Sequence, residues 1–106
     1  MKKILGIIAI TFIVLLFVAC GGNSITIVNR TGYTIYSAYV SHDSSTDWEE
    51  DVLGSSILVN GEKLKISLPR GGLWDIMLID TDGDSYTRYG VRSKSEAVFT
   101  IGDLDD

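Results

Sequence analysis

Three carboxylates at alternate positions form the strongest candidate site in this sequence. Asp80, Asp82 and Asp84 surround an Asp-Gly pair, which is typical of tight hairpin turns. Oxygens that converge on such a turn can bind calcium, which takes six to eight of them. The loop is not an EF-hand, because the sixth and twelfth positions counted from Asp80 hold Ser85 and Val91 instead of glycine and an acid. A solvated hairpin turn explains the same residues, so both interpretations stay open.

The longest irregular stretch, Ser41–Gly54, contains further acidic residues. If it folds over the same end of the domain as the Asp80–Asp84 turn, its carboxylates can add oxygens to a cation site. A short helix over Trp48–Leu53, begun by a Ser, Thr or Asp cap, is also possible within it. The acids concerned are Asp43, Asp47, Glu49, Glu50 and Asp51.

Other residue types give weaker indications of chemistry. His42, Asp43 and Ser44 are the residue types of a Ser-His-Asp hydrolase, but triads are assembled by position in space and not by adjacency. A single His and a single Cys leave no zinc site of the usual composition. Trp48, Trp74 and the tyrosines can form a sugar- or peptide-binding platform, although core packing explains large aromatics equally. We therefore expect no enzyme activity and no cofactor other than, in the alternative, calcium.

The first twenty residues have the layout of an export signal. Lys2 and Lys3 precede an apolar run over Ile4–Phe17, which is shorter than the roughly 20 residues of a membrane-spanning helix. Phe17-Val18-Ala19-Cys20 then resembles the lipobox of bacterial lipoproteins, with Phe17 where that family usually has an aliphatic residue. The resemblance implies diacylglyceryl transfer to Cys20, cleavage of residues 1–19, and fatty acids such as palmitate on the mature protein.

A lipid on Cys20 would explain the only cysteine of the chain and supply its attachment to a membrane. Residues 20–24 would then be the lipidated Cys and a short linker, and residues 25–106 the folded domain. Because Gly21 and not Asp follows the Cys, the resemblance favours the outer membrane over the inner one if the organism has two membranes. Loss of Lys2 and Lys3 takes the formal net charge from −5 to −7, which argues against nucleic acid as a partner.

Short β-rich segments separated by turn signals position these residues. The pattern predicts an all-β fold, a small antiparallel β-sandwich or barrel of about seven strands after a cleaved N-terminal signal helix. Asn60-Gly61 and Asp82-Gly83 predict hairpin turns, and the alternation over Glu62–Leu68 predicts a strand with one solvated face. The predicted strands are Ile25–Val28, Tyr33–Val40, Ser55–Val59, Glu62–Leu68, Leu73–Asp80, Tyr86–Val91 and Ala97–Ile101.

Three groups of residues give a second resemblance. They are Asn29-x-Thr31-Gly32-Tyr33-Thr34-Ile35, Trp48-x-x-Asp51-x-Leu53-Gly54, and Trp74-Asp75 with Asp82-Gly83-Asp84-x-Tyr86. Together they are similar to a group of small exported bacterial β-domains, many of them lipoproteins of unassigned function. This resemblance implies a fold and export but no activity.

The sequence thus predicts a membrane-anchored lipoprotein of the bacterial cell envelope, acting as a non-enzymatic binding or structural module with an unknown protein or glycan partner. A calcium-dependent binding module that uses Asp80, Asp82 and Asp84 is the alternative, and a hydrolase that uses His42 is third.

Overall fold

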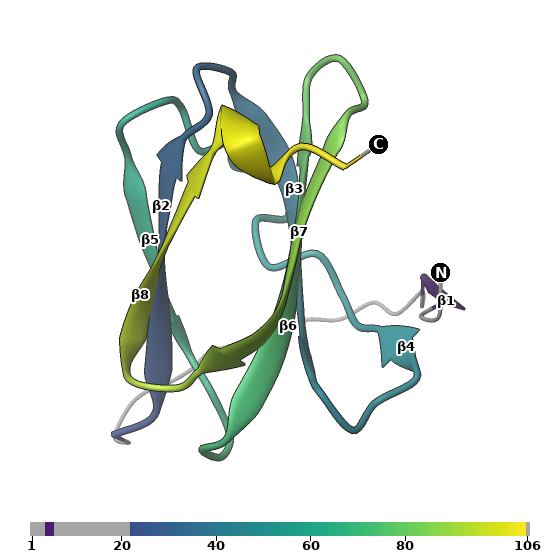
Figure 1. The fold of residues 1–106 in the computed structure, drawn as a ribbon, viewed down its shortest axis with the longest axis vertical. Coiled ribbons are helices and arrows are strands. Elements are labelled where there is room, and N and C mark those ends of the chain that lie inside the picture. The colour runs from purple at the N-terminus through teal and green to yellow at the C-terminus, as the bar shows by residue number, and fades with distance from the viewer. Residues whose placement is uncertain (1–3, 6–21, 106) are drawn as a thin grey trace.

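Two facing three-stranded sheets make up the domain in the computed structural model, which describes residues 4–5 and 22–105 (Figure 1). The all-β class is confirmed, and the two packed sheets form a small β-sandwich. The predicted signal segment and Cys20 lie outside the described residues, apart from Ile4 and Leu5. Among the residues that are described, no helix is long and apolar enough to cross a bilayer.

The first sheet has the strand order β5–β2–β8. Its central strand β2 (Ser24–Arg30) pairs antiparallel with β5 (Lys63–Ser67). On its other side β2 pairs in parallel with β8 (Ser95–Thr100), which differs from the antiparallel pairing expected throughout. The parallel ladder arises because β8 reverses the direction of the preceding strand through a tight turn, in which Lys94 has a positive φ of 66°. The first and last strands of the sandwich therefore lie side by side.

The second sheet has the order β3–β6–β7 and is antiparallel throughout. Its central strand β6 (Leu73–Asp80) lies between β3 (Ile35–His42) and β7 (Ser85–Arg92). The hairpin from β6 to β7 turns at Asp82-Gly83 as predicted, and Gly83 has the positive φ (84°) that such turns require.

The hydrophobic core lies between the two sheets. Along β2, Ile25 and Ile27 are fully buried while Thr26 between them is half-buried, and Ala97 and Phe99 are the buried residues of β8. This period of two is that of strands with one face toward a core. The second sheet contributes Ile35, Ala38, Val40, Trp74, Ile76, Leu78 and Tyr86 to the same cluster.

The predicted strand over Ser55–Val59 is not present. Within this segment only Leu58 forms a bridge, in which it exchanges two backbone hydrogen bonds of 2.9 Å with Ile35. The segment is pinned at one residue, and Ile57 beside it is left exposed. The Asn60-Gly61 turn does lead into β5, and the Asn60 side chain accepts a hydrogen bond from Gly32 N at 2.9 Å.

The short helix predicted over Trp48–Leu53 is also absent. Asp51 instead bridges to Tyr39 of β3. Its Oδ1 accepts hydrogen bonds from Ala38 N (2.8 Å) and from Leu53 N (3.0 Å). One carboxylate oxygen of Asp51 thus binds the backbone of Trp48–Leu53 to the edge strand β3, and this backbone is not helical.

The remaining elements are short. β4 (Asp47–Trp48) pairs in parallel with β1 (Ile4–Leu5). A 3-10 turn, η2 (Ile101–Asp103), follows β8 and is capped by Thr100, whose hydroxyl accepts a hydrogen bond from Gly102 N at 3.2 Å.

Arg88 joins the two sheets where β7 and β8 diverge. Its Nε and Nη2 each donate to one carboxylate oxygen of Asp103 at 3.0 Å, and Nη2 also donates to the Val98 carbonyl at 2.7 Å. Paired hydrogen bonds of this kind fix the orientation of both side chains. Burial acts to raise the pKa of Asp103, but the hydrogen bonds from Arg88 and from Thr100 N outweigh it and lower that pKa.

Asn29 organises the turn that leaves β2. Its side chain is fully buried, and its Nδ2 donates to the carbonyls of Tyr33 (2.8 Å) and Leu58 (2.9 Å). Its Oδ1 accepts from the backbone N (3.0 Å) and the hydroxyl (2.7 Å) of Thr31. The side chain therefore makes four hydrogen bonds, which is the full capacity of an amide that donates twice and accepts twice.

Replacement of Asn29 by Asp should destabilise the domain by about 2–4 kcal/mol, because a carboxylate cannot donate to the two buried carbonyls. Asn60→Asp is the matched control, since Asn60 is exposed and acts as an acceptor toward Gly32. Urea denaturation measures both variants. Equal stability of the two would contradict the assigned role of Asn29.

Candidate functional site

The carboxylates of Asp80, Asp82 and Asp84 converge as the sequence predicts. One oxygen from each residue lies within 4.8 Å of the others. The three side chains differ in environment, because Asp80 is 1% exposed whereas Asp82 and Asp84 are exposed. The group lies at the end of β6 where the chain turns toward β7.

The buried Asp80 holds this turn together. Its Oδ1 accepts from Asp82 N (2.9 Å) and Asp84 N (3.0 Å), and its Oδ2 accepts from the Tyr86 hydroxyl (2.8 Å). A carboxylate has about four lone-pair sites, and three of those on Asp80 are occupied. A cation at this turn would compete with those hydrogen bonds and would need oxygens beyond the three carboxylates. The geometry thus gives Asp80 a structural role, and calcium binding stays a prediction.

Asp47, Glu49 and Glu50 of the stretch Ser41–Gly54 lie away from this turn. β6 is paired so that Asp80 faces Ile35 at one end of the sheet and Trp74 faces His42 at the other. Asp47, Glu49 and Glu50 line a cavity with Trp74, at the second of these ends. The six residues from Trp74 to Asp80 span roughly 20 Å of extended strand. These acids therefore do not complete a cation site at Asp80.

His42 does not have the geometry of a catalytic triad. Its Nδ1 lies 2.8 Å from the Ser44 hydroxyl and 3.5 Å from an Asp43 carboxylate oxygen. A triad places the hydroxyl and the carboxylate on opposite ring nitrogens, so that the His can take a proton from one side while it is held from the other. Here both groups meet the same nitrogen, and Nδ1 also accepts from Ser44 N at 3.2 Å. The three residues form a local turn.

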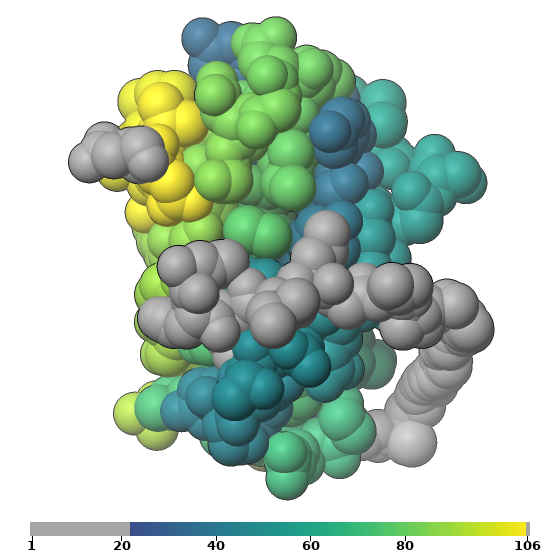
Figure 2. Space-filling view, turned by 90° about the vertical axis from the view of Figure 1, so that its right-hand side faces the viewer, coloured from purple at the N-terminus to yellow at the C-terminus, as the bar shows by residue number. Residues whose placement is uncertain are grey.

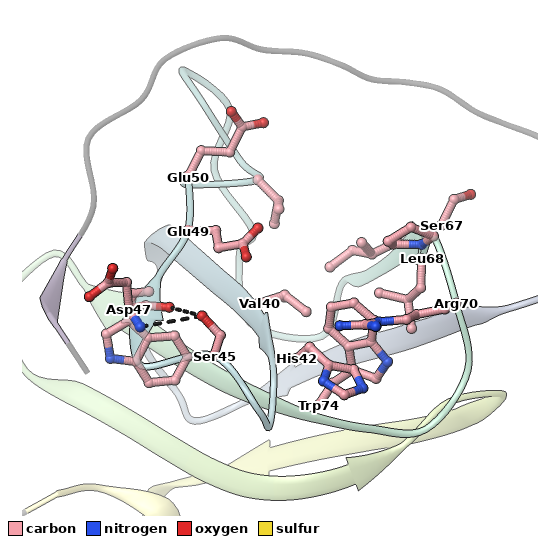
Figure 3. A pocket seen from close by; sticks show the side chains of 14 residues that line it. Val40, His42, Ser45, Asp47, Glu49, Glu50, Ser67, Leu68, Arg70 and Trp74 are labelled. Atoms are coloured by element: carbon pink, nitrogen blue, oxygen red, sulfur yellow. Dashed lines mark hydrogen bonds between the residues drawn. The ribbon is translucent and has the colours of Figure 1, made fainter. Parts of the chain in front are cut away.

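A cavity of about 820 Å³ lies at the end of the sandwich where β3 and β5 finish and β6 begins (Figure 3). Its apolar lining includes Val40, Leu68 and both tryptophans of the chain, Trp48 and Trp74. The teal segment that includes β4 supplies part of the cavity wall and is visible in the lower half of Figure 2, beside blue and green parts of the chain. This volume is in the range of small-molecule and cofactor sites.

The charged groups of this cavity are separated by sign. Asp47, Glu49 and Glu50 lie on one side, and Arg70 lies on the other (Figure 3). Burial, together with the negative charge of Glu49, raises the pKa of Glu50. The acidic side thus carries adjacent like charges that a bound cation would relieve.

Two aromatic residues form part of the opposite side. The rings of His42 and Trp74 meet edge to face, with 5.1 Å between their centres. Trp74 is 5% exposed, and its Nε1 is buried with no hydrogen-bond acceptor among the described residues. A buried donor without an acceptor costs free energy of roughly 1–3 kcal/mol.

The sequence did not single out this cavity. The sequence allows Trp48 and Trp74 to be core residues or part of a binding platform, and in the structure both are buried and both line the cavity. Nothing in the sequence marks Arg70 as a binding residue, since it lies in the Pro69-Arg70-Gly71-Gly72 turn segment after β5. The available hint was that the longest irregular stretch, rich in acids, contained one of the two tryptophans.

Comparison of the chain with protein-family models, with curated proteins and with solved structures found no match in any of the three. The candidate sites are therefore assigned from geometry alone.

Asp80→Ala should lower the free energy of unfolding by about 2–4 kcal/mol, because it removes the acceptor for two turn amides and a buried hydroxyl. Asp82→Ala should cost less than about 0.5 kcal/mol, since that side chain is exposed. Thermal unfolding with and without millimolar calcium measures both effects. We expect the melting temperature of the wild type to be unchanged by calcium. A rise that Asp82→Ala abolishes would establish the calcium alternative.

The pH dependence of stability should report Tyr86. Burial, the hydrogen bond to Asp80 and the charge of Asp80 raise its pKa from 10.0 to about 12. The pKa of Tyr86 is higher in the folded protein than in the unfolded chain. Its protonated hydroxyl therefore makes its full contribution to the free energy of unfolding below pH 10, and this contribution is lost as the pH rises from 10 to about 12. The slope is at most about 1.4 kcal/mol per pH unit.

Tyr86→Phe should remove the decrease in the free energy of unfolding that Tyr86 causes between pH 10 and about 12. Urea denaturation at several pH values between 9 and about 12 measures it. Tyr89→Phe, at an exposed position of the same strand, is the control and should keep it. Identical pH profiles for the two variants would contradict the assignment.

Proposed function

We propose that this chain is a lipid-anchored module of the bacterial cell envelope that binds a partner and catalyses no reaction. The observation that carries the proposal is the pattern of Met1–Cys20, a basic start and an apolar run that end in Phe17-Val18-Ala19-Cys20. Cleavage before Cys20 and acylation of its thiol would leave a β-sandwich with lipid at its N-terminus. Two or more acyl chains give a stable anchor, whereas one gives marginal binding.

The position of the first strand supports close attachment. β2 begins at Ser24, and the carbonyl of Asn23 already accepts a hydrogen bond from Leu68 N at 2.9 Å. Only two residues, Gly21 and Gly22, separate Cys20 from this hydrogen-bonded chain. An extended residue spans at most about 3.6 Å, so the sandwich would lie within roughly 15 Å of its attachment point.

The cavity would then face the region near the membrane. Ser67 and Leu68 line it, Ser67 is paired with Ser24 of β2, and Leu68 is hydrogen-bonded to Asn23. The candidate binding site and the proposed anchor thus belong to the same end of the sandwich. A partner, protein or glycan, would be bound close to the bilayer, and Gly21 after the Cys favours the outer membrane where there are two.

Asp80, the candidate metal ligand, and His42, the candidate catalytic residue, both make local structural contacts, which supports binding over catalysis. The oxygens of Asp80 accept hydrogen bonds from turn amides and a buried hydroxyl, and His42 forms a local turn with Ser44. The calcium-dependent alternative depends on the convergence of Asp80, Asp82 and Asp84 within 4.8 Å.

The anchor is tested by expression of the full chain in a bacterium that processes lipoproteins. We expect the wild type to incorporate labelled palmitate and to lose residues 1–19, as measured by intact-mass spectrometry. Cys20→Ala should do neither, because no other thiol is available. Ser44→Ala, a remote exposed change, should behave as the wild type. Label in Cys20→Ala, or an unprocessed wild type, would refute the assignment.

A further inference from the structure

The cavity beside β5 and β6 combines three properties that describe a ligand. It has an acidic side, a side with the positive charge of Arg70, and an apolar floor. We propose that it binds a short apolar peptide with free termini, with the ammonium group at the acidic side and the carboxylate at the opposite side. This inference rests on the proposed function, because it names the ligand class of the binding module.

The acidic side is held in a fixed position by Ser41. This side chain is fully buried at the end of β3. Its hydroxyl donates to the Asp47 carbonyl at 3.1 Å and accepts from Glu49 N at 3.1 Å. The backbone that carries Asp47, Glu49 and Glu50 is therefore tied to the sheet. Three carboxylates on a tethered segment are suited to bind an ammonium group through charge-assisted hydrogen bonds.

The opposite side offers donors. Arg70 presents a guanidinium, which binds carboxylates through paired hydrogen bonds. Trp74 Nε1 is buried beside the cavity without an acceptor among the described residues, and His42 contacts the same indole ring. Because Nε1 itself is not exposed to the cavity, a ligand oxygen would reach this donor only after a small shift of the surrounding side chains. Figure 3 shows Arg70, His42 and Trp74 together, across the cavity from the labelled acids.

The floor between the two sides is apolar. Val40, Leu68 and the two tryptophans line it, with Ile66 and Val52. Such a surface suits aliphatic side chains, because their burial removes apolar area from water. The cavity of about 820 Å³ is open to a ligand of several residues. Two separated charges and an apolar middle distinguish a free peptide from a simple amine or a fatty acid.

The test uses the protein purified in detergent from the membrane of a bacterium that processes lipoproteins, together with three probes. They are the dipeptide leucyl-leucine, its N-acetyl derivative and its C-terminal amide. Both tryptophans line the cavity, so tryptophan fluorescence reports occupancy directly, and calorimetry confirms the affinity. We expect the free dipeptide to bind at least about tenfold more tightly than either capped form, because each cap removes one charge-assisted contact.

Variants assign the two sides. Glu49→Gln with Glu50→Gln should abolish the preference for the free amino group and keep the preference for the free carboxylate. Arg70→Gln should do the reverse. Arg30→Gln is the charge-matched control for Arg70→Gln, and Glu96→Gln is a control that removes one acid elsewhere. Glu96 and Arg30 lie on the first sheet, outside the cavity lining, so both controls should leave both preferences unchanged.

Equal affinity for the three probes, or no fluorescence change up to about 10 mM dipeptide, would overturn the inference and leave water as the partner of Trp74 Nε1. Such a result leaves palmitate labelling at Cys20 untouched, so failure of this ligand assignment is distinguishable from failure of the proposed anchor.

Discussion

A backbone N–H group that leaves a sheet ladder and stays at least partly buried needs a hydrogen-bond acceptor, and in this domain polar side chains supply several of these acceptors. Asn29 does so after β2, Asp51 along the edge of β3, and Asp80 after β6. Asp75, 4% exposed, accepts from Gly90 N at 3.0 Å where the register of β6 and β7 shifts. The first three side chains fix loops that the strands alone would leave undetermined, and Asp75 satisfies an amide within β7 at the register shift.

This need for acceptors explains why Asp80, which resembles a metal ligand in the sequence, has a structural role. Asp80 has the residue type and spacing of a calcium ligand, yet three hydrogen bonds direct its oxygens into the turn. The turn is thereby preorganised without a metal. In contrast, Trp74 Nε1 has no acceptor in the described part of the chain, and Glu49 and Glu50 lie together on one side of the cavity. A buried donor without an acceptor and adjacent like charges indicate a ligand site more strongly than a carboxylate whose oxygens already accept hydrogen bonds within the protein.

Local patterns in the sequence were sufficient for most strands. The alternation over Glu62–Leu68 corresponds to β5, where Lys63 and Lys65 are exposed while Leu64 and Ile66 are half-buried. Asp-Gly at 82–83 fixed one hairpin because positive φ is a local requirement. The β-sandwich class followed from the number and spacing of such segments.

Features that depend on distant residues were not predictable in this way. The parallel ladder between β2 and β8 joins segments at opposite ends of the domain. The helix expected over Trp48–Leu53 does not form, because the Asp51 carboxylate instead accepts hydrogen bonds from Ala38 N of β3 and from Leu53 N. Helix propensity along the local sequence does not report a contact with a distant strand. The cavity combines side chains from β3, the β4 segment, β5 and β6, so its charge separation exists only in the folded chain.

Amide hydrogen exchange measured by NMR tests most directly whether side-chain acceptors hold the loops. Asp82 N, Asp84 N and Leu53 N, each bonded to an aspartate oxygen, should exchange at least about a hundredfold more slowly than in an unfolded peptide. Their protection should approach that of Ile76 N in the central strand β6. Exchange of these loop amides at the rate of an unfolded chain, with Ile76 N still protected, would contradict the account.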